Sequence, residues 1–383
     1  MINLLIQILM GFLLGIAAGI VPGLHPNMIA LIALISFSHP SSFIVVAVML
    51  VSSQFFAFLR SVFLFVPDES HALALHPIYK MVGDGNGLFA VKLGLTGILL
   101  ALILSIIASP LLNLIIPFLF SNISPYIPFM LLTVSVFFIF KDKKPLYALI
   151  IFLLAGALGF FGLDRLNQPL MVMLAGFFSM PVLLTMNPKI PIQKSTFRKI
   201  ERKIMFKGSL SSFLAAFFAI FLPGVGPAQA SLITRGLMKR TEEFILSIGA
   251  LSGFNITFSA ILLHTVNKSR VGALVMLGQN YVFGLNALLT FLFVCLSVGL
   301  ICYVLIIHLS KRITKIIPKI NYQKISVATI ILLSGFVLYF DLWMGLLFFV
   351  LATMIGFIAS KLKVRMANCM GCLVLPLLIF YFL

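Results

Sequence analysis

Pro223-Gly224-Val225-Gly226-Pro227 divides an apolar stretch that runs from Gly208 to Arg235. Proline lacks a backbone donor and glycine favours turns, so these residues cannot continue a helix. The arm before the break, residues 208–222, has 15 residues. That length gives about 22 Å of helix, which is short for a membrane crossing. Because Lys207 precedes the stretch and Arg235 ends it, both ends favour the same aqueous side. The stretch predicts a re-entrant hairpin of two helical arms.

A related break lies near the N-terminus, where Pro22-Gly23-Leu24-His25-Pro26 interrupts apolar residues 5–37. The offset between the two breaks is 201 residues (223 minus 22), and residues 52–65 parallel residues 252–265 at the nearly equal offset of 200 (252 minus 52). We interpret the chain as two repeats, each a hairpin followed by about five transmembrane helices. Since five is odd, the second repeat begins on the opposite side of the membrane. This predicts two inverted-topology repeats, an architecture that many secondary transporters use.

The composition indicates an all-α polytopic membrane protein. The chain is 62% hydrophobic and 9% charged, against roughly 45–50% and 25% in soluble domains. Its long uncharged runs suit membrane helices, and they lack the alternation of a β-barrel. No cleavable signal peptide is indicated, because residues 1–20 have no basic region before the apolar run. The net charge of +18 lies mainly in short loops, so we predict membrane lipids and no nucleic acid as partners.

The basic loops set the predicted topology. Residues 141–144, 189–207, 311–324 and 361–365 are rich in Lys and Arg, which places them in the cytoplasm. The protein is then a multi-pass protein of the cell membrane with both termini outside. The first repeat covers residues 1–187 with its hairpin tip at 22–27, a basic cytoplasmic linker covers 188–207, and the second repeat covers 208–383 with its tip at 223–229. The predicted spans are 42–66, 89–109, 126–140, 146–163, 168–187, 243–266, 283–308, 325–340, 342–360 and 366–383.

The two hairpin tips are the candidate binding site. A broken helix exposes an N-terminus with free N–H groups and a partial positive charge, and such ends bind anions. Two tips that face one another would form a central anion site. Packing kinks satisfied by neighbouring helices are the alternative. The residues assigned to the site are Pro22, Gly23, Leu24, His25, Pro26 and Asn27 from the first tip, and Pro223, Gly224, Val225, Gly226, Pro227 and Gln229 from the second.

Two further residues are singled out by their charge. Arg60 lies inside the predicted span 42–66, where an arginine costs about 2.5–3.5 kcal/mol and usually faces a cavity or a partner. A role in substrate binding, a role in coupling and a structural contact with a carbonyl group all stay open. His25 titrates near neutral pH when unperturbed, so proton coupling is a hypothesis. No cofactor is predicted, and the coupling ion, H⁺ or Na⁺, is left open.

Other classes of protein find little support in the sequence. The acidic and histidine residues between 68 and 86 have no regular metal-ligand spacing, so no metal site is predicted. The four cysteines, Cys295, Cys302, Cys369 and Cys372, lie in apolar stretches and are expected to be buried thiols. The chain lacks the usual nucleophile, metalloprotease and nucleotide-binding motifs. No carboxylate lies centrally in a predicted span, so we predict a protein that is not an enzyme.

The two tips also carry a family resemblance. Gly19-x-x-Pro22-Gly23-Leu24 and Leu222-Pro223-Gly224-Val225-Gly226 resemble the signature regions of the TctA family, the large membrane subunit of tripartite tricarboxylate transporters. Pro22 to Asn27, with Pro67-Asp68-Glu69 downstream, is similar to the shorter archaeal branch of that family. His25 stands where the usual motif has glycine. The resemblance implies a solute permease built from two repeats. We therefore expect a secondary transporter for an organic anion, with a carboxylate as the leading substrate class.

Two alternatives stay open beside this one. The paired Pro-Gly tips resemble a family of polyprenyl-phosphate transporters, although the Ser-Gly-Gly of that family's motif is absent here. A lipid-phosphate translocase is therefore the first alternative, and an intramembrane enzyme is the second. The predicted partners are membrane lipids and a small organic anion or a lipid phosphate. A homo-oligomer is compatible with the sequence, and accessory transporter subunits are neither indicated nor excluded.

Overall fold

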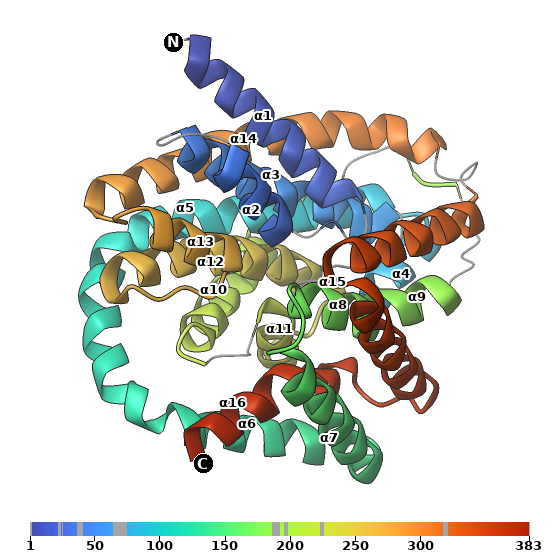
Figure 1. Ribbon diagram of the computed structural model, residues 1–383. Helices are drawn as coiled ribbons and strands as arrows, with labels where there is room; N and C mark the ends of the chain where they lie inside the picture. The colour runs from blue at the N-terminus through green and yellow to red at the C-terminus, as the bar shows by residue number, and fades with distance from the viewer. Residues whose placement is uncertain are drawn as a thin grey trace. The chain divides into compact units, whose positions relative to one another are not determined.

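The computed structural model describes residues 2–21, 24, 26–36, 41–63, 75–185, 192–194, 198–222, 226–316 and 321–382. All regular structure in these ranges is helical (Figure 1), so the predicted helical class is confirmed. The helices are α1 (Ile2–Ile20), α2 (Pro26–Ser36), α3 (Ser41–Phe63), α4 (Leu75–Gly83), α5 (Gly87–Ile123), α6 (Ile127–Phe140), α7 (Pro145–Gly162), α8 (Pro169–Leu174), α9 (Met180–Thr185), α10 (Arg202–Ala219), α11 (Pro227–Leu237), α12 (Thr241–Val266), α13 (Gly272–Asn280), α14 (Leu285–Ile316), α15 (Tyr322–Lys361) and α16 (Gly371–Phe382).

Six helical stretches of the described chain are long and apolar enough to cross a membrane. Gly87–Phe140 is 54 residues long, about 80 Å if straight, which exceeds twice the roughly 30 Å of a bilayer core. The predicted loop at 110–125 is wrong over most of its length, because α5 continues through Pro110 and Pro117 to Ile123. Proline is tolerated in membrane helices when neighbouring groups satisfy the freed carbonyl groups. By contrast, α15 is broken by the non-helical Leu342, where the predicted spans 325–340 and 342–360 meet.

Two short helices add to the predicted elements. Helix α4 lies between the predicted spans 42–66 and 89–109, where no helix was predicted, and α13 follows the long helix α12. With them, the order of elements is the same in both halves of the chain: two arms, a long helix, a short helix and a very long helix. The first half has α1, α2, α3, α4 and α5 in this order, and the second has α10, α11, α12, α13 and α14.

The chain forms two compact units, and each unit takes segments from both halves. The first unit comprises residues 1–122, 189–221 and 225–320, and the second comprises 123–188, 222–224 and 321–383. Both pairs of arms therefore belong to the first unit. The last helices of each half belong to the second. The predicted repeats describe the order of the chain, whereas the units describe which helices pack together.

Helices α3 and α12 form the interior of the first unit. Of their most apolar stretches, 89% and 94% of the residues are buried. Helix α5 of the first half crosses α12 of the second half so closely that a Cβ atom at Gly97 would overlap the carbonyl oxygen of Leu246. Helix α14 of the second half packs against α3 of the first. Small residues permit such close crossings in membrane proteins. The long helix of each half therefore covers the buried helix of the other.

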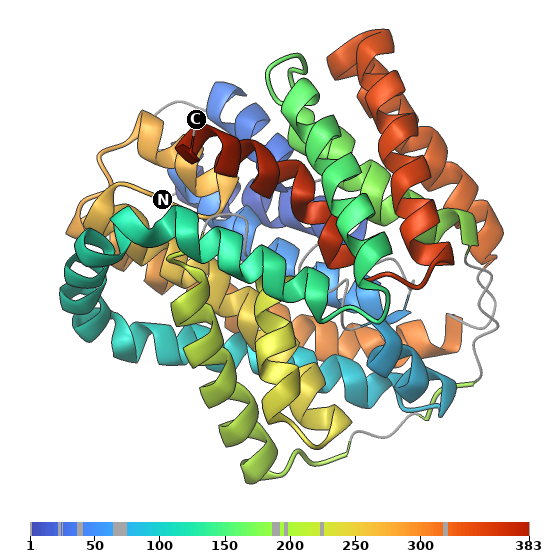
Figure 2. The same ribbon diagram turned by 90° about the horizontal axis from the view of Figure 1, so that it is seen from below.

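Two buried aspartates organise the second unit, in which α16 runs beside α7 (Figures 1 and 2). Asp142, in the turn between α6 and α7, accepts hydrogen bonds from the backbone N–H of Arg365 at 2.8 Å and the side-chain amide of Asn368 at 3.1 Å. Asp341, at the break in α15, accepts bonds from the backbone N–H groups of Asn167 and Gln168. Each aspartate thus binds the segment that begins the last helices of the other half. The two contacts are reciprocal between the halves, as expected for halves related by a two-fold axis.

Replacing Asp142 with alanine is expected to lower the melting temperature of the purified protein by about 5–10 °C. The substitution leaves the backbone donor of Arg365 and the buried side-chain donor of Asn368 without their carboxylate, and hydrogen bonds to a charged group contribute about 1.5–3 kcal/mol each. Differential scanning fluorimetry in detergent measures the shift. Lys143→Ala, one residue away and exposed, is the control and is expected to change little. A melting temperature for Asp142→Ala within 2 °C of the wild type, at about the precision of the method, would contradict this role.

Candidate functional site

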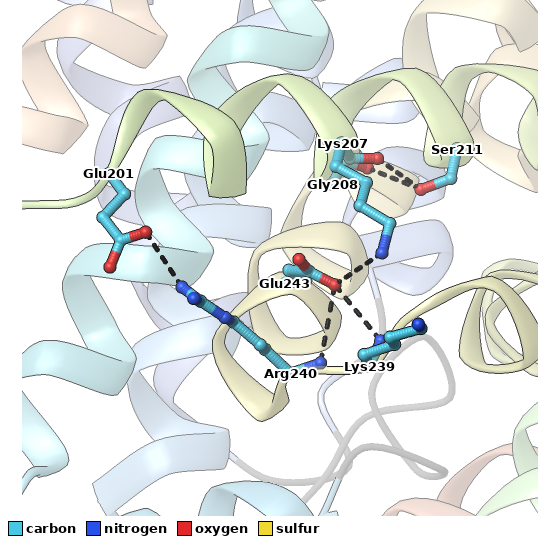
Figure 3. Close-up of polar contacts among 7 residues, drawn as sticks. All are labelled: Glu201, Lys207, Gly208, Ser211, Lys239, Arg240 and Glu243. Carbon is cyan, nitrogen blue, oxygen red and sulfur yellow. Dashed lines mark hydrogen bonds and ion pairs between the residues drawn. The ribbon is translucent and has the colours of Figure 1, made fainter.

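Helices α10 and α11 form a hairpin whose two ends meet at one carboxylate. Glu243, in the first turn of α12, accepts from the ammonium of Lys207 at 3.1 Å (Figure 3). It also accepts from the backbone N–H of Lys239 at 3.2 Å and of Arg240 at 3.5 Å. Lys207 lies near the start of α10, and Lys239 and Arg240 follow the end of α11. The chain therefore leaves this point along one arm and returns to it along the other.

A second contact holds the arms one turn further along α12. Ser212 of α10 donates a hydrogen bond to the carbonyl oxygen of Ser247 at 3.0 Å, and Thr234 of α11 pairs with the Ser247 hydroxyl at 3.2 Å. Residues four apart lie on one face of a helix, so Glu243, Ser247, Leu251 and Asn255 form a single stripe. The first two members of the stripe hold the base of the hairpin. The last two lie at its tip.

A narrow cavity lies at this tip, with a volume of only about 10 Å³, which is about the space of one water molecule. Arg270, in the loop between α12 and α13, donates a hydrogen bond from its Nε to the carbonyl oxygen of Ile220 at 2.7 Å. Helix α11 begins at Pro227 beside the cavity, and the first turn of a helix leaves N–H groups for other partners. The cavity thus combines a guanidinium, a side-chain amide and a helix N-terminus. Its lining residues are Ala216, Ala219, Ile220, Gly226, Pro227, Ala230, Leu251, Asn255 and Arg270.

The structure describes only part of the predicted site. Gly226 and Pro227 line the cavity, whereas Pro223, Gly224, Val225 and the side chain of Gln229 lie outside the described residues. In the first tip, Pro22, Gly23 and His25 lie outside them, while Leu24 and Pro26 are half-buried. Because three residues of each tip lie outside the described residues, a central site between two facing tips stays a prediction.

Asn27 has a defined position in the first tip. Its side-chain oxygen accepts a hydrogen bond from the backbone N–H of Ala273 at 2.9 Å, in the first turn of α13. A Cβ atom at Gly272 would overlap this side chain, so the contact is tight. Asn27 therefore stabilises the N-terminus of a helix from the other half of the chain. The assignment of Asn27 to substrate binding stays a prediction.

Arg60 makes the carbonyl contact that the sequence left open as one of its roles. Its Nη1 donates to the carbonyl oxygen of Val21 at 3.1 Å, and only 6% of the residue is exposed. Val21 follows the C-terminal end of α1, which carries a partial negative charge. Arg270 makes the matching contact with Ile220 at the end of α10. In each hairpin, an arginine side chain thus binds the carbonyl group that follows the end of the first arm. The two arginines come from different positions in their halves.

Arg270 is the residue that sequence reasoning missed. It falls between the predicted spans 243–266 and 283–308, on the outer side in the predicted topology, and no motif singled it out. One signal was present: the positive-inside rule leaves few basic residues on the outer side, so an arginine there calls for a reason. Nothing local indicated that its side chain reaches a residue 50 positions earlier in the chain.

Replacing Glu243 with alanine is expected to loosen the base of the hairpin. The change removes the carboxylate that accepts hydrogen bonds from the Lys207 ammonium and from two backbone N–H groups. Because Glu243 is buried, these donors are left without an acceptor where water replaces it poorly. Limited trypsin digestion in detergent should then cut more than about tenfold faster after Lys239 or Arg240, because local opening exposes this segment. Glu201→Ala breaks the exposed ion pair with Arg240 and serves as the control, since exposed pairs contribute little. Equal cleavage rates in the two variants would contradict the role of Glu243.

Comparison with known proteins gives the family. The model of the tripartite tricarboxylate transporter TctA family matches residues 5–371. The chain belongs to this family. The match confirms the resemblance carried by the two Pro-Gly tips. An uncharacterized protein of Methanocaldococcus jannaschii is 30% identical to the chain over 354 residues, which cover 87% of both proteins. No solved structure matches the chain.

Membership in the TctA family, with the six long apolar helices, establishes a multi-pass component of a transport system. The large subunits of tripartite transporters work with accessory subunits, so partners of this kind are expected. The comparisons lend no support to the polyprenyl-phosphate resemblance. The prediction that the four cysteines are buried is confirmed. In the described ranges, no three His, Cys, Asp or Glu side chains gather as metal ligands would. The location in the cell membrane and the outer position of both termini stay predictions.

Proposed function

We propose that this protein is a secondary permease for an organic anion with carboxylate groups. The observation that carries the proposal is the position of Arg270, which lines the cavity at the start of α11. A guanidinium offers paired donors that match the two oxygens of a carboxylate. The N-terminus of α11 and the Asn255 amide add donors to the same space. Together with membership in a tricarboxylate transporter family, this donor set favours a carboxylate over a cation or a neutral solute.

The cavity is narrow, so a substrate as large as a tricarboxylate requires it to widen. The contacts of Glu243 and Ser247 hold the base of the hairpin. Small side chains at Ala216, Ala219 and Ala230 line its tip. We therefore propose that the tips of the arms separate while their base stays fixed. We propose that either H⁺ or Na⁺ is the coupling ion. Measuring uptake with a proton gradient and with a sodium gradient, imposed separately, identifies it.

The proposed permease has inverted repeats, and the charges around the two aspartates support this. Asp142 is flanked by Lys141, Lys143 and Lys144, and it binds the backbone of Arg365. The segment bound to Asp341 contains Arg165 as its single basic residue between 163 and 170. By the positive-inside rule, the turn that contains Asp142 favours the cytoplasm and the turn that contains Asp341 favours the outside. Two turns that correspond in the halves would then lie on opposite faces.

A ligand screen tests the proposed function. Purified protein in detergent is heated with citrate, succinate, phosphate or a short-chain polyprenyl phosphate, and uptake of the stabilising compound is then measured in proteoliposomes. A ligand at 100 times its dissociation constant stabilises the folded state by about 2.7 kcal/mol. Stabilisation and uptake of a carboxylate are the expected results. Stabilisation by the lipid phosphate alone would replace the proposal with a lipid-phosphate translocase, and no response to any carboxylate would overturn it.

A further inference from the structure

A wide groove lies at the far end of α12 and around α13, with a volume of about 860 Å³. Its charged and titratable lining residues are His264, Lys268, Arg270 and Tyr281, and amide side chains of Asn267, Gln279 and Asn280 join them. No Asp or Glu is among the described residues that line it. The groove is therefore a cationic surface rich in hydrogen-bond donors. Such a surface raises the local concentration of anions.

The groove and the tip cavity share Arg270, which lines both. Helix α12 gives their order, because Glu243 at the hairpin base, Asn255 at the tip and His264 in the groove follow one another along it. At 1.5 Å per residue, Asn255 is about 18 Å and His264 about 32 Å from Glu243. The groove thus lies beyond the tip, on the side away from the base of the hairpin. An anion in the groove would reach the tip cavity past Arg270.

We propose that the groove is a capture site for the carboxylate substrate, in which Lys268 makes the first contact and Arg270 binds the anion at the opening of the tip cavity. The inference rests on the proposed function and adds a second binding site to it. Lys268 is exposed, and its ammonium lies 4.9 Å from the centre of the Phe120 ring. That contact holds a strongly hydrated cation at the rim of the groove. Arg270 is half-buried and points to the hairpin through its bond to Ile220.

Citrate binding to the purified full-length protein tests the capture site by isothermal titration at low and high salt. Lys268→Met is expected to raise the dissociation constant about fivefold at about 20 mM NaCl, since one unit charge at contact distance in water corresponds to roughly that factor. The effect should shrink at about 300 mM NaCl because salt screens exposed charges. Lys268→Arg keeps the charge and should bind as the wild type does. Lys315→Met is the matched control, because Lys315 is exposed near the other end of α14, about 45 Å along that helix from the groove.

The outcomes separate the two proposals. Wild-type protein that binds neither citrate nor succinate overturns the proposed function, and the capture site with it. Wild-type protein that binds citrate while Lys268→Met and Lys315→Met bind equally well overturns the capture site alone. A third arm repeats the titration with anionic phospholipid added to the detergent. Loss of the Lys268 effect in that arm would show that a lipid headgroup occupies the groove, which also overturns capture of the free solute.

Discussion

Arg270→Gln is expected to weaken citrate binding by at least about 30-fold and to abolish measurable uptake. Truncating one partner of a buried, hydrogen-bonded charge pair typically costs 2–5 kcal/mol or more, and 2 kcal/mol corresponds to about 30-fold in affinity. Arg270 lines both the groove and the tip cavity, so its loss affects capture and binding together. Arg270→Lys keeps the charge but not the paired donors, and an intermediate affinity is expected. Citrate titration and proteoliposome uptake measure both effects.

Arg60→Gln is the matched comparison for Arg270, because Arg60 also donates to a carbonyl at the end of a first arm. Its loss is expected to lower the melting temperature and to leave the affinity for citrate within about threefold of the wild type. A tenfold change in affinity corresponds to 1.4 kcal/mol of binding free energy. A variant that stays within threefold of the wild type therefore affects the stability of the fold and not the binding of citrate. If both variants bind citrate as the wild type does, Arg270 is a structural residue only. If both lose binding equally, the site lies elsewhere or includes Arg60 directly.

Single cysteines at Lys143 and Asp164 are expected to label from opposite sides of the membrane. A membrane-impermeant maleimide added to intact cells should modify Asp164→Cys and leave Lys143→Cys unmodified. In inverted membrane vesicles the same reagent should modify Lys143→Cys and leave Asp164→Cys unmodified. Both residues are exposed in turns, one beside Asp142 and the other close to the segment that binds Asp341. The expected contrast is nearly complete, because a charged reagent crosses a bilayer core very slowly.

The wild-type protein supplies the background for this labelling, since its four cysteines are buried. A general maleimide applied after denaturation controls for the amount of each variant. Labelling of both cysteines from the same side would mean that α7 does not cross the membrane and that the Asp142 and Asp341 turns share one face, which would contradict inverted repeats. Labelling of Lys143→Cys from outside alone would reverse the predicted topology while keeping the inversion. The two results are therefore distinct.

Much of the helical layout could be predicted from the sequence because its determinants are local. In a bilayer the backbone must satisfy its own hydrogen bonds, so an apolar run becomes a helix wherever no break intervenes. The two arms on either side of residues 223–227 and the turn beside Asp341 followed from this rule. The rule failed at Pro110 and Pro117, where α5 continues. Whether a proline breaks a helix in a membrane depends on neighbours that the sequence does not place.

The sequence by itself determined the helical class, the positions of the two breaks and, through the Pro-Gly motifs, the TctA family, because each depends on residues that are close together in the chain. Only the tertiary structure decided the partners of the polar side chains. Asn27 meets Ala273 across 246 residues, and Arg270 meets Ile220 across 50. Asp142 and Asp341 likewise each bind a segment of the other half that lies more than 170 residues away in the chain. Such pairs form because helices from both halves pack into each compact unit, so a buried polar group finds its partner in whichever helix lies beside it.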